Sequence, residues 1–401
     1  MVVHEEPVPY PFGTPRGLEL VPAYRQAREG AGLTRVRLPF GPPAWLATRY
    51  EDVKAVLVDP RFSRAAVVGP DEPRVLLAPN TPDTLLSMDP PEHTRVRRVV
   101  AGAFTARRVE RLREWTQGVA EEMVDAVRRQ GPPADLIESL AMPLPITVLC
   151  QLLGVVYTDR ARFREWSSTL LSTGHRSPEE VEAAEREIRA YVSELVALRR
   201  DQPGDDLISA LVHMRDTEDR LTERELVGLS LAILVAGYET TANTIVNMSY
   251  TLLANPALFD QIRATPELIP KAVEELLRAL PLTVPAALFA RMATEDVQIG
   301  ATLVKAGESV LPGSMAANQD EAVFPDARRV DFSRANAGAH LAFGHGVHHC
   351  LGAQLARMEL RVAIGTLVTR LPGLRLAVPA EEITWRSGTI IRAISSLPVT
   401  W

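Results

Sequence analysis

A glycine-rich loop around a single cysteine, with a long amphipathic helix after it, is the feature of this chain that most constrains its fold. The loop runs from Phe343 to Gly352, and its cysteine is Cys350. A helix start favours a thiolate, because its dipole and its free backbone N–H groups stabilise negative charge on sulfur. Glycines at 344, 346 and 352 let the backbone approach a flat ligand closely and adopt a positive φ where needed. The loop therefore predicts a site for an anionic sulfur.

The chain has only two cysteines, Cys150 and Cys350, which are too few for a disulfide framework. A buried structural thiol is the usual fate of a free cysteine, and it suits Cys150, whose surroundings at 146–153 form a mostly apolar helix. For Cys350 a zinc site is an alternative, because imidazole and thiolate are both zinc ligands. The histidines available to such a site are His340, His345, His348 and His349. Adjacent ligands at 348–350 are poorly placed to surround one tetrahedral ion, so zinc ranks second.

Nine residues of the segment 343–357 resemble the cysteine-ligand loop of the cytochrome P450 family. They are Phe343, Gly344, Gly346, His348, Cys350, Gly352, Leu355, Ala356 and Arg357. In that family the thiolate is the axial ligand of a haem iron, and its electron donation favours cleavage of the O–O bond. The resemblance implies that Cys350 is the metal ligand of a haem b and that Phe343 and Gly344 belong to the cofactor-binding loop.

A second motif, Ala236-Gly237-Tyr238-Glu239-Thr240-Thr241, lies in the middle of a long expected helix. Glycine and β-branched threonine are poor helix formers there, which suggests a site. The segment resembles the family's oxygen-binding helix. The resemblance implies that Gly237 leaves room for a diatomic ligand, that Thr240 hydrogen-bonds this ligand and that Glu239 helps to relay protons. The alternative is that Thr240 only bonds back to a carbonyl group of its own helix and bends it.

The spacing Glu-x-x-Arg occurs three times, at 92–95, 110–113 and 275–278. It places an acid and an arginine on one helical face, so most copies are expected to be ordinary surface pairs. Only the copy formed by Glu275 and Arg278 lies at the family's distance before the cysteine. The resemblance implies that this pair is buried and supports the haem-binding core.

A haem carries two carboxylates that need hydrogen-bond donors. The segment Asp89-Pro90-Pro91-Glu92-His93 predicts an N-cap acid and prolines before a helix, with His93 and Arg97 one turn apart on the same face. These two residues resemble the family's propionate-binding pair, and the resemblance adds Arg291 and His348. Taken alone, each is more often a solvated charge or a core histidine.

Helical periodicity covers most of the chain. The expected helices are 52–58, 92–103, 108–128, 146–153, 160–171, 178–200, 205–214, 222–254, 256–264, 269–280 and 352–371. Strands are expected mainly at 297–310 and 374–399, with a short hairpin around the turn at 41–43. No repeat, linker or boundary interrupts the pattern. We therefore expect a mostly α fold with small β-sheets (α+β), the single-domain cytochrome P450 fold, with one haem-thiolate monooxygenase domain over 1–401.

Charge and hydropathy exclude some partners. Acidic residues outnumber basic ones by 50 to 44, and the net charge of −6 argues against nucleic acid as the main partner. The longest apolar stretch, 226–237, is shorter than the ~20 residues that a membrane span needs. The first fifteen residues lack the pattern of a signal peptide. We expect a cytoplasmic monomer without a membrane partner.

The resemblance implies a monooxygenase that inserts one oxygen atom of O2, by hydroxylation or epoxidation, into a hydrophobic small molecule. It implies electrons from NAD(P)H through a ferredoxin reductase and a ferredoxin. A basic docking face for an acidic ferredoxin is hypothesised from Arg95, Arg98, Arg107, Arg108 and Arg111. Variable loops expected to line the pocket lie near Val67, Leu85, 172–177, 284–288 and Ile390.

Many of these pocket residues are apolar, which suits a macrolide, another polyketide or a different secondary metabolite. Only three lysines accompany the arginines among the 44 basic residues, a bias typical of an actinomycete-like, GC-rich source and hence of antibiotic biosynthesis. Two alternatives stay open. One is a haem-thiolate sensor or carrier without turnover, and the other is a zinc-binding structural protein.

Overall fold

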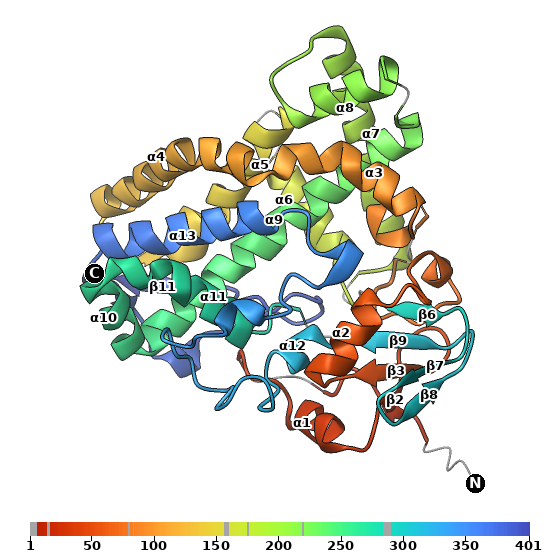
Figure 1. The fold of residues 1–401 in the computed structure, drawn as a ribbon. Helices are drawn as coiled ribbons and strands as arrows, with labels where there is room; N and C mark the ends of the chain where they lie inside the picture. The colour runs from red at the N-terminus through yellow and green to blue at the C-terminus, as the bar shows by residue number, and fades with distance from the viewer. Residues whose placement is uncertain are drawn as a thin grey trace. The chain divides into compact units, whose positions relative to one another are not determined.

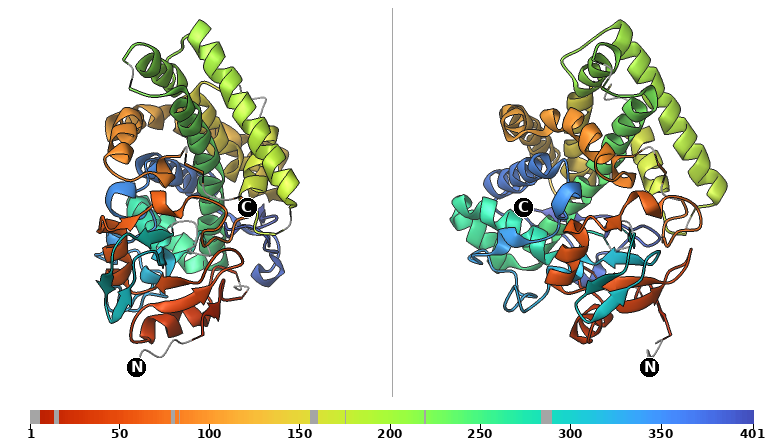
Figure 2. Two further views of the ribbon diagram at one scale, coloured as in Figure 1. Left: turned by 90° about the vertical axis from the view of Figure 1, so that its right-hand side faces the viewer. Right: turned by 45° about the vertical axis from the view of Figure 1, so that its right-hand side comes forward.

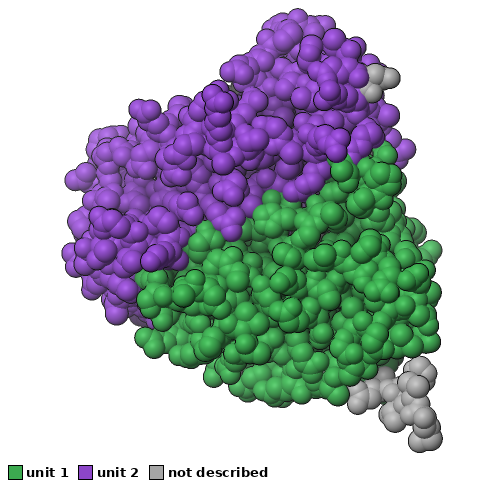
Figure 3. Space-filling model, viewed as in Figure 1, with its two compact units in different colours: residues 1–94, 172–178, 274–350 green, residues 95–171, 179–273, 351–401 purple. Residues whose placement is uncertain are grey.

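The computed structural model describes the chain apart from residues 1–5, 14–16, 79–80, 83, 156–159, 175, 219 and 284–289. The chain divides into two compact units, which Figure 3 shows in different colours. Unit 1 consists of residues 1–94, 172–178 and 274–350, and unit 2 of residues 95–171, 179–273 and 351–401. The single domain over 1–401 stays a prediction.

Unit 1 is built on a sheet of six short strands in the order β1-β2-β3-β9-β6-β4. The strands are β1 (Val8–Pro9), β2 (Thr34–Arg37), β3 (Ala44–Ala47), β4 (Phe62–Ser63), β6 (Arg291–Ala293) and β9 (Ser309–Pro312). The predicted hairpin is confirmed, because β2 pairs antiparallel with β3 around Gly41, whose φ is +78°. Strand β6 pairs with β4 on one side and β9 on the other, so neighbours on both sides hold its register.

The core of unit 1 lies between this sheet and the helix α2 (Tyr50–Val58), which packs against β9 (Figure 1). The buried side chains Val53, Val56 and Leu57 of the helix form one cluster with Phe62 and Val310. The other elements are α1 (Pro22–Glu29), η1 (Ala65–Val67), η2 (Leu85–Ser87), β7 (Val297–Ile299), β8 (Thr302–Val304), α12 (Ser314–Ala317), η8 (Ala337–Ala339) and η9 (Gly346–His348). The helices α3 (Glu92–Ala101) and α11 (Ile269–Ala279) each contribute residues to both units.

Unit 2 is helical, and α9 (Glu223–Ala254) is its central helix. It contacts α5 (Pro143–Leu153), α6 (Arg160–Leu170), α8 (Leu207–Asp216), α10 (Pro256–Ala264) and α13 (Ala353–Arg370). The helix α4 (Ala106–Gln130) lies beside α13 in every view (Figures 1 and 2). The remaining elements are α7 (Pro178–Asp201), the π-helical turn η4 (Ile137–Ala141), the short helices η3 (Gly102–Phe104), η6 (Pro266–Leu268) and η10 (Ala380–Glu382), and the strands β5 (Ala134–Asp135), β10 (Arg375–Leu376) and β11 (Pro398–Thr400).

The predicted mostly helical fold with small sheets is confirmed, and every predicted helix is present within a few residues of its expected ends. The prediction for α10 matches the observed bounds, because Pro256 marks its start. Helix α1 and strand β6 were missing from the prediction. Both are short, and β6 has only three residues, too few for a periodic pattern.

Among the described residues, α9 is the one helix with the length and mean hydropathy of a membrane span. This differs from the expectation that no segment reaches that length. Just over half of its most apolar window, 56%, is buried inside the protein, as in the core helix of a soluble protein. Glu239, Asn243 and Asn247 are also buried on this helix, and such polar side chains suit a protein core better than lipid.

Candidate functional site

The cysteine loop owes its path to two of its glycines. Gly344 and Gly346 have φ values of +70° and +71°, which residues with a Cβ atom rarely adopt. A Cβ on Gly346 would also lie 2.6 Å from the carbonyl oxygen of Leu57, so this loop passes directly against the end of α2. Gly352, with φ −84°, needs no such freedom. The sequence-based expectation for positive φ thus holds at two of the three glycines.

The loop presents Cys350 just before a helix. Its backbone N–H donates to the carbonyl oxygen of Phe343 at 2.8 Å, and α13 begins three residues later at Ala353. Cys350 is exposed, whereas Cys150 is 3% exposed in the core, as predicted. The two thiols therefore have different environments, and Cys350 is the one that an external ligand can reach.

The zinc alternative gains no support from the histidines. Across the described part of the chain, no three His, Cys, Asp or Glu side chains are arranged to hold a metal ion. His340 lies 3.2 Å from the carboxylate of Glu274, and its Nδ1 accepts the N–H of Ala342. This side chain is therefore committed to local structure.

Unit 1 brings several predicted carboxylate-binding residues together. His93 in α3 is buried, and its ring centroid lies 4.2 Å from that of His348 in η9. Arg291, the first residue of β6, is also buried, and its Nε atom has no hydrogen-bond partner among the described residues. Burial lowers the pKa of Arg291 to about 10, and the charge of Asp89 opposes this change. Arg97 lies one turn after His93 and is half-buried.

Sequence reasoning missed Arg64, which is only 2% exposed. Its Nε donates to the carbonyl oxygen of Leu86 at 2.7 Å, and its Nη1 donates to that of Ala290. Burial lowers the pKa of Arg64 to about 9, the like charge of Arg291 lowers it further, and Asp89 opposes both. The sequence did contain one indication that Arg64 is buried, because this arginine directly precedes the apolar residues 65–68.

Asp89 differs from its expected role. Its carboxylate accepts hydrogen bonds from the Ser63 hydroxyl group and from the backbone N–H groups of Arg64 and Ala65, so it stabilises the turn at η1. Only its backbone carbonyl oxygen accepts the N–H of His93, at 2.8 Å. The prediction that the Asp89 side chain caps the α3 helix is therefore wrong, because the neighbouring turn offers its carboxylate three donors.

The charges of this cluster fit the carboxylates of a haem. Two buried arginines, Arg64 and Arg291, are electrostatically coupled to the single acid Asp89. A buried positive charge is costly unless an anion compensates it. The excess positive charge and the unpartnered Nε of Arg291 therefore favour an anionic ligand in unit 1.

Only one of the three Glu-x-x-Arg pairs is buried. The side chains of Glu275 and Arg278 are both 0% exposed, and two hydrogen bonds of 2.8 Å join them. Arg278 also donates to the carbonyl oxygen of Asn318, while Glu275 accepts from Arg334 and from the N–H of Asp331. The carboxylate thus connects α11 to the chain around residues 331–334.

The other two copies differ from this pair. Glu110 and Arg113 form an exposed ion pair on α4. Arg95 pairs with Glu225 and donates to the carbonyl oxygen of Arg220. Equal spacing therefore gives a buried pair at 275–278 and a surface pair at 110–113, while Arg95 also holds the residues at the start of α9.

The motif at 236–241 lies in unit 2, on α9. Thr240 is half-buried, and Ala236 is exposed although most of this helix is buried. The Thr240 hydroxyl group donates to the carbonyl oxygen of Ala236 at 2.6 Å, which is the bond that the alternative interpretation requires. A Cβ on Gly237 would lie 3.2 Å from a methyl carbon of Leu149, so the glycine also lets α5 approach closely. That Gly237 leaves room for a diatomic ligand stays a prediction.

Glu239 is the acid of this motif and is 3% exposed. Burial raises the pKa of Glu239 to about 7, and the positive charges of Arg386 and Arg164 oppose the increase. Arg164 in turn donates to Glu138 at 2.8 and 3.0 Å. The two arginines come from distant parts of the chain, which is why the sequence motif did not include them. The carboxyl group is thus poised to gain or lose a proton near neutral pH.

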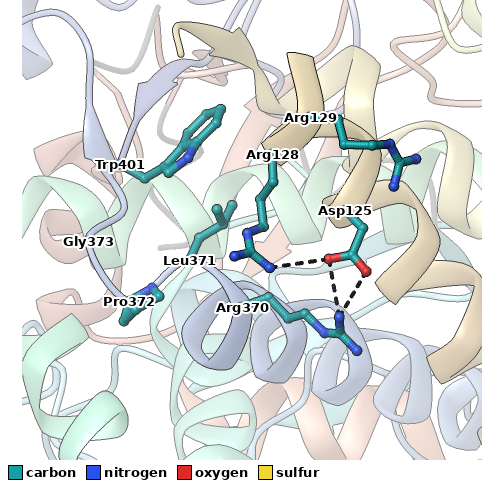
Figure 4. A pocket seen from close by; sticks show the side chains of 8 residues that line it. All are labelled: Asp125, Arg128, Arg129, Arg370, Leu371, Pro372, Gly373 and Trp401. Carbon is teal, nitrogen blue, oxygen red and sulfur yellow. Dashed lines mark hydrogen bonds and ion pairs between the residues drawn. The ribbon is translucent and has the colours of Figure 1, made fainter. Parts of the chain in front are cut away.

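A cleft of about 740 Å³ lies at the ends of α4 and α13 and is distinct from these residues. Its lining, shown in Figure 4, consists of Asp125, Arg128, Arg129, Arg370, Leu371, Pro372, Gly373 and Trp401. Arg370 is paired with Asp125 and Glu121, and Arg128 lies 3.6 Å from Asp125. No predicted site residue lines the cleft.

Comparison with known proteins gives one family. The family model described as Cytochrome P450 matches residues 163–372. The chain is 50% identical to nocardicin C N-oxygenase of Nocardia uniformis subsp. tsuyamanensis over 393 residues, 98% of each chain. It is 49% identical to mycinamicin IV hydroxylase/epoxidase of Micromonospora griseorubida over 396 residues, 99% of each chain. The crystal structure of HinD with NMFT and NO is similar, with a TM-score of 0.95 and 47% identity over 99% of this chain and 100% of that one.

Proposed function

The chain belongs to the cytochrome P450 family and is a monooxygenase of that family, and from this premise we propose that it oxygenates a hydrophobic secondary metabolite. A macrolide or another polyketide is the proposed substrate class. The name of one relative, mycinamicin IV hydroxylase/epoxidase, supports this class, whereas the name of another, nocardicin C N-oxygenase, supports only the broader class of secondary metabolites. The observation that carries the assignment of the site is the exposed thiol of Cys350, held directly before α13 by a loop with two positive-φ glycines.

The proposed cofactor is a haem b, whose iron the thiolate of Cys350 would hold. When bound, this group would activate O2 so that one oxygen atom enters the substrate and the other, with two electrons and two protons, leaves as water. The residues proposed to hold its ring and carboxylates are His93, Arg97, Gly237, Arg291, Phe343, Gly344 and His348. Buried Glu275 and Arg278 support the chain beneath this site. We propose that residues 1–401 act as one domain.

Glu239 and Thr240 are proposed to supply protons to the reacting oxygen. They are neighbours on α9, and the pKa of Glu239 near 7 lets the carboxyl group act as donor at neutral pH. The Thr240 hydroxyl group donates to the Ala236 carbonyl oxygen. Rotation about χ1 of Thr240 would release that donor towards a bound ligand, so the observed bond and the proposed role are two states of one side chain.

Replacing Thr240 with alanine is expected to lower the yield of product per O2 consumed by about tenfold, which is less than the ~10²–10⁴ in rate that positioned proton transfer contributes in full. Thr244→Ala is the matched control, because its half-buried hydroxyl group makes the same kind of bond, to the carbonyl oxygen of Thr240 at 2.7 Å. Oxygen consumption and product are measured together with a surrogate ferredoxin system. Equal coupling in the two variants would mean that Thr240 only bonds back to its helix.

Coupled product formation is expected to decline as the pH rises through about 7, because Glu239 then loses the proton that it donates. Glu239→Gln should be slower at neutral pH and should lack this inflection. The measurement is the rate of product formation between pH 5.5 and 9 for both proteins. An unchanged inflection in Glu239→Gln would assign the ionisation to another group. No product from either protein, with haem bound, would favour a sensor or carrier.

We propose that electrons come from NAD(P)H through a ferredoxin reductase and a ferredoxin, and that the protein is a cytoplasmic monomer. In the hypothesised docking face, Arg95 is exposed but also pairs with Glu225. Arg98, Arg107 and Arg111 remain exposed, and Arg108 lies 3.9 Å from Asp205. A positive surface of this kind accelerates association with an acidic ferredoxin and weakens at high salt.

Among the predicted pocket segments, Val67 and Ile390 are buried and Leu85 is half-buried. Residues 284–288 lie outside the described part of the chain, and so does His175 within 172–177. The described apolar side chains support a hydrophobic substrate.

A further inference from the structure

Arg64 is a buried arginine whose side chain is bound to backbone carbonyl groups instead of an acid. It donates to Leu86 in η2 and to Ala290, the residue directly before β6. These segments are far apart in the sequence, and the Arg64 guanidinium group joins them within unit 1. Such bonds hold the geometry but leave the positive charge of the group uncompensated.

The surroundings of Arg64 make this charge unusual. Its like-charged neighbour is Arg291, whose Nε has no hydrogen-bond partner among the described residues. The acid that acts on both arginines is Asp89, and its carboxylate already accepts three hydrogen bonds from the Ser63–Ala65 turn. Two buried cations and one acid leave a net positive charge, which calls for an anion.

We propose that Arg64 is a positioning residue of the haem site, which fixes Ala290 and hence the start of β6, and supplies a second buried positive charge for the haem carboxylates. The inference rests on the proposed function, because it takes haem as the anion. It adds to that function a residue outside the predicted set of carboxylate ligands. Arg64 acts through its charge and through Ala290, the neighbour of Arg291.

A charge so placed affects the iron as well as the carboxylates. Positive charge in a low-dielectric interior favours the reduced state of the iron, which carries one positive charge fewer than the oxidised state. Removing the charge of Arg64 is therefore expected to lower the reduction potential, and removing the charge of Asp89 to raise it. Damage to the fold alone would not produce shifts of opposite sign.

The test compares holoproteins carrying Arg64→Gln, Arg64→Lys and Asp89→Asn with wild type. Arg61→Gln is the control, because Arg61 lies three residues before Arg64, on the other side of β4, but is exposed and paired with Asp59 and Glu295. Two quantities are measured: the reduction potential, and the rate at which haem transfers to added apomyoglobin. We expect Arg64→Gln to lower the potential and to speed haem transfer about tenfold, equivalent to about 1.4 kcal/mol.

Arg64→Lys should keep the wild-type reduction potential, because it keeps the positive charge. It should lose haem faster than wild type, because an ammonium group cannot reproduce the two hydrogen bonds of the guanidinium group. Asp89→Asn should raise the potential, and Arg61→Gln should match wild type in both measurements.

The proposal is overturned if Arg64→Gln matches Arg61→Gln, or if the Arg64→Gln and Asp89→Asn potentials shift in the same direction. If Arg64→Gln does not fold, Arg64→Lys and Asp89→Asn decide, and an unchanged Asp89→Asn potential counts against the proposal. Failure of the proposed function itself would show separately, as a wild-type protein without a haem-thiolate spectrum.

Discussion

Replacing Cys350 with alanine is expected to abolish the red-shifted Soret band of the reduced, CO-treated protein. This band is the signature of a thiolate opposite CO on ferrous haem, so it requires the sulfur and not only the haem. Cys150→Ala is the matched control, since Cys150 is the second thiol of the chain and is buried in α5. The control should retain the band at full amplitude per haem, with a modest loss of stability from the missing sulfur atom.

The measurement is a difference spectrum of each purified protein after dithionite and CO, normalised to haem content. Wild-type protein without the band would contradict the haem-thiolate assignment as a whole. A band that survives in Cys350→Ala and disappears in Cys150→Ala would move the ligand to the other cysteine. A haem-containing Cys350→Ala protein with an unshifted band is the expected result, because the carboxylate-binding residues remain in place.

Replacing Glu275 with glutamine is expected to destabilise the holoprotein by about 3–5 kcal/mol, the cost of leaving a buried charge without its partner. Arg278 would lose its negatively charged partner while fully buried, and Arg334 would lose the same charge. Glu110→Gln is the matched control, since it removes the acid of an exposed pair with the same spacing and should cost about 0–1 kcal/mol.

Urea unfolding of wild type, Glu275→Gln and Glu110→Gln, followed by far-UV circular dichroism and by haem absorbance, gives the midpoints to compare. Glu275→Asp should recover part of the loss, because it keeps the charge and shortens the reach to Arg278. Equal midpoints for Glu275→Gln and Glu110→Gln would mean that the buried pair contributes no more than a surface pair. That result would remove its proposed role as support for the haem-binding core.

Long periodic elements were predictable because their signals are local. Helices α9, α10 and α13 have clear starts in Thr222, Pro256 and Gly352, and the observed elements begin next to or at these residues. The β2–β3 hairpin follows from the turn at 41–43. The cysteine loop was predictable because its residue types and their spacing are specific. Positions with positive φ accept few residues other than glycine, so such a loop is recognisable in the sequence.

Burial was the property that local pattern did not contain. Glu275 and Glu110 have identical spacing to their arginines, and only packing of α11 against the chain at 331–334 makes one of them buried. Arg64 is buried because η2 and Ala290 surround it, and these segments are distant in the sequence. The carboxylate of Asp89 was assigned to the wrong turn, because the α3 helix and the Ser63–Ala65 turn compete for it only in three dimensions.

The pairing of strand β6 bears on how the position of Arg291 is fixed. Arg291 stands on a strand that is paired on both sides, and slipping such a strand by one residue would turn every side chain to the opposite face. A change in the residues before the strand would therefore leave the register of β6, and with it the position of Arg291, in place.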